Sequence, residues 1–169
     1  MASKLPNRKK LRAIRLLLLD VDGVMTDGGI YFSERGDELK KFNIHDGYGI
    51  AKLRKSGLQV GILTGRSSQL VARRAQELGI TEVYQNLENK LEAYERLKRK
   101  ISVGDDEVAY IGDDEPDIPV MQKVGFAACP VNAVSVVQKE ADFICRNRGG
   151  EGAVREVVEI ILESRSRGA

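Results

Sequence analysis

The chain has 169 residues, of which 42% are hydrophobic, so it is long enough for one domain with a hydrophobic core. Its 27 lysines and arginines nearly balance 25 aspartates and glutamates, and the net charge of +2 gives no indication of a nucleic-acid partner or a membrane surface. The two cysteines form no CxxC pair, which argues against a disulfide framework and favours a reducing compartment.

The chain starts with a basic segment that leads into four leucines before Asp20. That apolar run is shorter than the roughly 7–15 residues of a secretory signal. It is also shorter than the about 20 residues of a membrane span. We therefore expect a solvated basic tail, a cytoplasmic protein and no membrane segment.

Short apolar runs followed by polar or turn residues recur along the chain, and they are typical of strands covered on both faces. The strong runs are 15–19, 59–63, 107–111 and 141–145, and the weaker ones are 82–84 and 125–128. Amphipathic helical patterns lie between them: one begins at a cap on Ser67 or Ser68 and ends at Gly79, and others cover 91–101 and 153–162. This alternation predicts a single α/β domain over 1–169, with a Rossmann-like parallel sheet and helices on both faces.

One segment, residues 28–49, interrupts the alternation. Two short strands near 30–32 and 39–42 flank the turn sequence SERGDE, which predicts a β-hairpin over about 28–43, inserted after the first strand. Lys40 and Lys41 are expected to form a charged hairpin edge that limits aggregation. Asp27 is expected to be a turn aspartate bonded to its own backbone.

Polar residues follow several strands of the predicted sheet. Asp20 comes directly after the first strand, and Asp22, two residues on, points to the same side in an extended chain. Because ligands bind beyond the carboxyl ends of parallel strands, the residues at the other strand ends and at one helix start should lie nearby. These are Thr64, Gly65, Arg66, Asp113, Asp114, Asp117 and the pair Asn89–Lys90.

This collection of side chains is suited to phosphoryl transfer. Neighbouring carboxylates repel one another unless a cation lies between them, and Mg²⁺ is the most suitable hard cation. It would clamp a phosphoryl oxygen, while the Thr64 hydroxyl, backbone N–H groups and Lys90 hold the others. One carboxylate then attacks phosphorus to form an aspartyl phosphate, and the second protonates the leaving alkoxide and later deprotonates water.

Four motifs in chain order, DVDGVMTDG, ILTGR, Lys90 and GDDEPD, resemble those of haloacid dehalogenase superfamily phosphatases. The resemblance implies that Asp20 is the nucleophile and Asp22 the general acid/base. It further implies that Mg²⁺ is bound by Asp20, the backbone carbonyl of Asp22 and Asp113, and that Thr64 and Lys90 bind the phosphoryl group. Asp114 and Asp117 would support these residues from behind, and the central strands would follow the order 3-2-1-4-5.

The gaps from Asp20 to Thr64 and from Thr64 to Lys90 are too short to house a cap domain. Capless members with a hairpin here resemble one subgroup, the 3-deoxy-D-manno-octulosonate 8-phosphate phosphatases, to which KKFNIHDGYGI, TGRSS and RNRGGEGAVREV are also similar. That resemblance implies a homotetramer in which the hairpin and the C-terminal tail, about 146–169, of neighbouring subunits help to close each site. It implies that the sugar acid is contacted by Asn43, Asp46, Gly47, Gly65, Arg66 and Arg74.

The identity of the substrate stays open at the level of sequence. His45 and Ala51 stand where the subgroup has a basic residue and, in some members, a long cationic one. The nearest rival substrate is a nine-carbon keto-deoxy sugar acid 9-phosphate, but its phosphatases tend to replace Arg66 with an acidic residue. The sequence is also compatible with a broad-specificity phosphatase or a non-enzymatic oligomeric module, although the intact motifs speak against the module.

Overall fold

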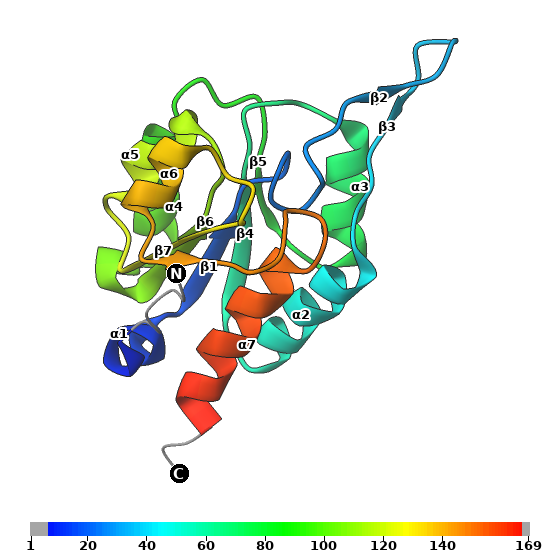
Figure 1. Ribbon diagram of the computed structural model, residues 1–169. Helices are drawn as coiled ribbons and strands as arrows, with labels where there is room; N and C mark the ends of the chain where they lie inside the picture. Colours follow the sequence, from blue (N-terminus) through cyan, green and yellow to red (C-terminus); the bar gives the residue numbers. More distant parts are fainter. Residues whose placement is uncertain (1–6, 167–169) are drawn as a thin grey trace.

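The computed structural model describes residues 7–166, and its centre is a six-stranded sheet in the order β5-β4-β1-β6-β7-β8 (Figure 1). All neighbouring strands are parallel. The strands are β1 (Leu16–Leu19), β4 (Gln59–Leu63), β5 (Glu82–Tyr84), β6 (Val108–Ile111), β7 (Phe126–Cys129) and β8 (Phe143–Ile144). The six predicted strands and the order of the central five are therefore confirmed.

Helices cover both faces of the sheet. One face carries α1 (Arg8–Ala13), α2 (Ile44–Lys55), α3 (Gln69–Glu77) and α7 (Ala153–Ser166). The other carries α4 (Lys90–Ile101), α5 (Ile118–Met121) and α6 (Ser135–Glu140), with the short turns η1 (Asp105–Glu107) and η2 (Glu115–Asp117) nearby. The four leucines of β1 alternate between the two layers, since Leu17 and Leu19 pack under the first and Leu16 and Leu18 under the second. The continuous apolar run is thus explained by burial on both sides.

The inserted hairpin consists of β2 (Tyr31–Phe32) and β3 (Glu38–Leu39) and projects away from the body (Figure 1). Its strands are shorter than predicted, because beyond them only an isolated bridge between Thr26 and Phe42 joins the two arms. The large apolar side chains of its arms, Ile30, Tyr31, Phe32 and Leu39, are exposed. Within residues 7–166, the segments between β1 and α4 contain this hairpin, α2, β4, α3 and β5, and no cap domain.

The start of the described chain differs from expectation, whereas its last helix was predicted. The basic start was expected to be a solvated tail, but residues 8–13 form α1, which Asn7 caps and whose Leu11 is buried, while residues 1–6 lie outside the described part. The amphipathic helix predicted over 153–162, within the C-terminal stretch, is confirmed as α7, and its apolar face belongs to the core. The two ends hold each other, because Arg12 Nε donates to the carbonyl of Ser164 at 2.7 Å.

Helix length and composition also bear on membrane insertion, because a span needs about 20 mostly apolar residues. No helix within residues 7–166 is long and apolar enough to cross a bilayer.

Candidate active site

Three neighbouring strands deliver the predicted site residues to one edge of the sheet. Asp20 follows β1, and its N–H donates to the carbonyl of Ile111 at 3.0 Å, so β1 and β6 stay paired up to the site. Thr64 follows β4 and is fixed by its own N–H, which donates to the carbonyl of Tyr84 at 3.0 Å. Asp20 and Thr64 are buried although both are polar. Burial of polar groups lowers the stability of the fold, which indicates that these two are held at the sheet edge for function.

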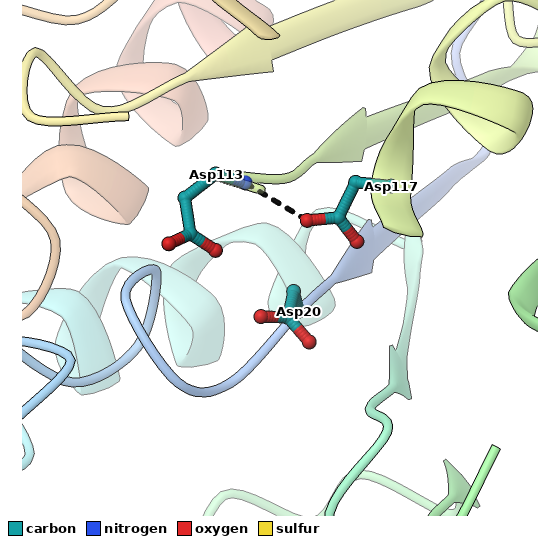
Figure 2. Close-up of side chains that lie close together, drawn as sticks. All are labelled: Asp20, Asp113 and Asp117. Atoms are coloured by element: carbon teal, nitrogen blue, oxygen red, sulfur yellow. Dashed lines mark hydrogen bonds between the residues drawn. The ribbon is translucent and has the colours of Figure 1, made fainter. Parts of the chain in front are cut away.

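Three carboxylates gather at this edge. Asp20, Asp113 and Asp117 each offer one oxygen within 4.8 Å of the others. Figure 2 shows them close together, with Asp20 after β1 and both Asp113 and Asp117 in the connection after β6. Asp117 Oδ2 accepts the N–H of Asp113 at 2.9 Å and that of Asp114 at 3.2 Å. Asp117 therefore acts as a brace that shapes the loop carrying Asp113.

Lys90 enters this cluster from the first turn of α4. Asn89 caps that helix by accepting the N–H of Glu92, which fixes the start of the helix at Lys90. Its ammonium donates to Asp20 Oδ1 at 2.7 Å and to Asp117 Oδ1 at 2.6 Å. The Tyr110 hydroxyl also donates to Asp117 Oδ1, at 2.5 Å, so the brace is held by donors on both oxygens.

The electrostatics of the cluster call for an added cation. Burial raises the pKa of Asp113 to about 8, and the charges of Asp20 and Asp117 push it the same way. Burial likewise raises the pKa of Asp20 to about 6, although Lys90 opposes this. Burial acts to lower the pKa of Lys90, but the charges of Asp20 and Asp117 outweigh it and leave that pKa raised. One ammonium is thus too little positive charge for these carboxylates.

A divalent cation fits beside Asp20 and Asp113. Asp113 Oδ1 is buried and has no hydrogen-bond partner, so it is an oxygen available as a ligand. A Cβ at Gly23, where φ is +94°, would lie 2.0 Å from Asp113 Oδ2, so only glycine leaves this carboxylate in place. Hard oxygen donors of this kind suit Mg²⁺. Asp117 is a poorer ligand, because its oxygens are already used by donors.

Asp22 lies apart from this carboxylate group and faces the hairpin. Its carboxylate accepts a hydrogen bond from Lys40 Nζ, and Arg66 Nε lies 4.0 Å from its Oδ2. Of the implied metal ligands, Asp22 can therefore contribute only its backbone carbonyl. Its side chain is 26% exposed, as a group that exchanges protons with a leaving group and water requires.

The predicted sugar-acid contacts fall into two groups. Arg66 lies near the site, where its Nη2 pairs with Glu38 Oε1 at 2.9 Å, and Gly65 is next to Thr64. The others brace the start of α2 instead. Asn43 caps that helix, since its Oδ1 accepts the N–H of His45 at 2.7 Å. Arg74 Nη2 donates to the Asn43 carbonyl at 3.4 Å.

Asp46 and Gly47 also have local structural roles. The buried Asp46 carboxylate accepts the N–H groups of Gly152 at 3.3 Å and Arg155 at 2.8 Å, which caps the start of α7. A Cβ at Gly47 would lie 2.3 Å from Arg74 Nη2, so the glycine makes room for that guanidinium. Asp46 thus uses its polar atoms in joining α2 to α7.

Two minor predictions concern the residues around the hairpin. Asp27 is confirmed as a turn aspartate, because its Oδ1 accepts the N–H of Gly29 at 3.0 Å. Lys41 is an exposed edge residue as predicted, but Lys40 is not: its side chain is only 3% exposed and contacts Asp22. The alternation of side chains along a strand was the available signal, since neighbouring lysines must point to opposite sides.

The chain is similar to proteins of known family. Residues 49–125 match the family described as haloacid dehalogenase-like hydrolase. The chain is 48% identical to the 3-deoxy-D-manno-octulosonate 8-phosphate phosphatase of Escherichia coli K12 over 153 residues, 90% of this chain and 81% of that protein.

Solved structures of phosphatases with the same name are also similar to this chain. The crystal structure of the phosphatase of that name from Yersinia pestis superposes with a TM-score of 0.93 at 45% identity, covering 95% of this chain and 86% of that one. The Moraxella catarrhalis phosphatase, solved with magnesium, phosphate and 3-deoxy-D-manno-octulosonate, superposes with a TM-score of 0.91 at 41% identity, covering 93% of this chain and 90% of that one.

Proposed function

The chain belongs to the haloacid dehalogenase-like hydrolases, in the group of the 3-deoxy-D-manno-octulosonate 8-phosphate phosphatases, and from this membership we propose that it removes phosphate from that eight-carbon sugar acid. The observation that carries the proposal is the arrangement of Asp20, Lys90 and Asp113 at one sheet edge. Metal-assisted phosphoryl transfer requires these groups: a buried carboxylate, a buried ammonium beside it and a second acidic metal ligand.

The residues divide the reaction into two displacements. Asp20 attacks phosphorus through a carboxylate oxygen while the ester P–O bond breaks, and Asp22 gives its proton to the leaving oxygen. Asp22 then takes a proton from water, the water oxygen attacks the aspartyl phosphate, and Asp20 is released with inorganic phosphate. Lys90, the Thr64 hydroxyl and nearby backbone N–H groups hold the phosphoryl oxygens. Asp20, Asp113 and the Asp22 carbonyl would hold Mg²⁺, which would supply positive charge to neutralise the phosphoryl group.

Arg66 and Gly65 are our candidate contacts to the sugar acid. Arg66 is close to Asp22 and pairs with Glu38 through Nη2, and exchange of Glu38 for a substrate carboxylate would let the guanidinium bind that carboxylate through two N–H groups. Asn43, Asp46, Gly47 and Arg74 are better explained as the frame that supports the site, because their contacts serve the starts of α2 and α7. The proposed substrate contacts therefore narrow to the side of the site next to the hairpin.

We further propose that the chain works as a homotetramer in the cytoplasm. The hairpin supports the assembly, because its exposed side chains include Phe32, which is 65% exposed, and Leu39, which is 59% exposed. A partner subunit would cover them and could complete the open site. Cys129 and Cys145 are free and buried, which fits a reducing compartment.

Steady-state phosphate release tests the proposal. The substrates are 3-deoxy-D-manno-octulosonate 8-phosphate, the nine-carbon 9-phosphate and p-nitrophenyl phosphate, each with Mg²⁺ and with EDTA. We expect kcat/KM for the eight-carbon ester to exceed the others by about 100-fold, and EDTA to abolish it. Preference for the nine-carbon ester, or equal low rates on all three, would assign a different specificity. No Mg²⁺-dependent release from any ester would favour a non-enzymatic module.

A further inference from the structure

A lysine of the hairpin contacts the side chain assigned to proton transfer. Lys40 follows β3, and its Nζ donates to Asp22 Oδ1. The same nitrogen lies 3.4 Å from Glu38 Oε1. Since its side chain is 3% exposed, the ammonium is held away from water, and such burial is tolerated only where carboxylates replace the lost hydration.

Lys40 belongs to a chain of ion pairs that joins three segments. Glu38 Oε1 also accepts from Arg66 Nη2 at 2.9 Å, and Glu38 Oε2 accepts from the Ser68 hydroxyl at 3.0 Å. The base of the hairpin is thereby fixed both to the loop after β1, through Asp22, and to the loop after β4. The Asp22 carboxylate, which has Lys40 on one oxygen and Arg66 near the other, therefore has fewer orientations than a free side chain at the surface.

We propose that Lys40 is a positioning residue for Asp22, which it holds where that carboxyl delivers its proton to the leaving oxygen. The inference rests on the proposed function in one respect, that Asp22 is the general acid. In that step the Asp22 O–H bond breaks as the ester P–O bond breaks, and the proton ends on the leaving alcohol. Lys40 keeps all its protons and touches neither phosphorus nor the leaving oxygen.

The role predicts an effect that depends on the leaving group. A sugar alkoxide has a high pKa and leaves poorly without a proton, so its departure needs a correctly placed acid. p-Nitrophenolate is stable as an anion and needs little help. Because kcat/KM covers the steps up to formation of the phosphoenzyme, loss of Lys40 should lower it for alkyl esters and spare the aryl ester. A purely structural role would lower both together.

The test compares Lys40→Met with Lys41→Met. Methionine keeps most of the length of the side chain and removes the donor. Lys41 is the matched control because it is 59% exposed and pairs with Asp27. For Lys40→Met we expect a loss of kcat/KM of about 50-fold on the eight-carbon ester and less than about 3-fold on p-nitrophenyl phosphate. Lys41→Met should change neither. Equal losses on both esters, or none on the sugar ester, would overturn the proposal.

Two further experiments cover the cases in which the variant does not fold or the proposed substrate is wrong. If Lys40→Met does not fold by circular dichroism, Lys40→Arg replaces it. The arginine keeps the cation but displaces the donor, so a loss confined to the sugar ester is again expected, and equal losses contradict the role. If the wild type hydrolyses p-nitrophenyl phosphate but not the eight-carbon ester, the proposed substrate fails. The comparison then uses glucose 6-phosphate as the alkyl ester, and the Lys40 proposal is judged on that.

Discussion

The Asp46 carboxylate accepts the backbone N–H of Arg155 at 2.8 Å, which joins the first turn of α2 to the first turn of α7. The same carboxylate accepts the N–H of Gly152 at 3.3 Å, so it caps a helix more than a hundred residues away. The glycine-rich segment 149–152, just before α7, contacts the loop after β1 that carries Asp22, since the Gly150 N–H donates to the Val24 carbonyl at 3.0 Å. Asp46 therefore supports the site indirectly, by holding the start of α7 and the segment before it in place.

Replacement of Asp46 should lower stability before it affects catalysis. Asp46→Ala leaves two N–H groups without their acceptor in a buried place, and we expect the free energy of unfolding to fall by about 2 kcal/mol. Urea denaturation measures this, with Asp37→Ala at the hairpin turn as the control. If Asp46 instead contacts the sugar acid, the variant will keep its stability and show a raised KM.

The acidic cluster predicts how pH changes stability when metal is absent. The folded-state pKa of Asp113, about 8, and that of Asp20, about 6, lie above the unfolded value near 4, so the folded state binds more protons between these limits. Stability should therefore fall as pH rises through this window, by up to about 1.4 kcal/mol per pH unit for each proton. Thermal denaturation in EDTA at pH 5 to 8 measures it.

Mg²⁺ should reverse this trend, because it favours the ionised carboxylates. We expect a larger Mg²⁺-induced rise in Tm at pH 8 than at pH 6. Asp113→Asn serves as the comparison, and it should flatten the metal-free pH dependence and remove most of the Mg²⁺ response. A Mg²⁺ response of equal size in the variant would place the ion elsewhere.

The hairpin should control assembly. Phe32→Glu puts a charge in the middle of the exposed apolar surface, and we expect it to shift the proposed tetramer to smaller species. Light scattering over a range of concentrations measures the mass. Lys9→Glu on α1, also exposed, is the control and should leave the mass unchanged. A wild type that is monomeric at every concentration would remove the basis for the hairpin as an assembly arm.

Much of the fold and of the site follows from the sequence, for an identifiable reason. Strands buried on both faces leave continuous apolar runs, and the polar residues that end them are forced to one edge, so Asp20, Thr64 and Asp113 could be placed by pattern. Lys90 could be placed because Asn89 marks the start of its helix.

Side-chain direction within polar segments could not be read in the same way. Asp46 stands in a motif that resembles a substrate loop, yet its partner is a helix start far along the chain. Strand alternation predicts that Lys40 and Lys41 point to opposite sides, but the packing of the hairpin base against the site decides which of the two is buried. The basic start was misread because its cations suggested a solvated tail, whereas Leu11 is buried and Arg12 donates to the carbonyl of Ser164 near the end of α7.

The most direct test of the central claim is Mg²⁺-dependent phosphate release from 3-deoxy-D-manno-octulosonate 8-phosphate by the wild type and by Asp20→Asn. Asparagine keeps the shape of the side chain but cannot form the aspartyl phosphate. With Asp20 as the nucleophile, we expect rapid release by the wild type and a loss of at least about 1,000-fold in the folded variant. A variant that releases phosphate as fast as the wild type would contradict the assignment of Asp20 as nucleophile.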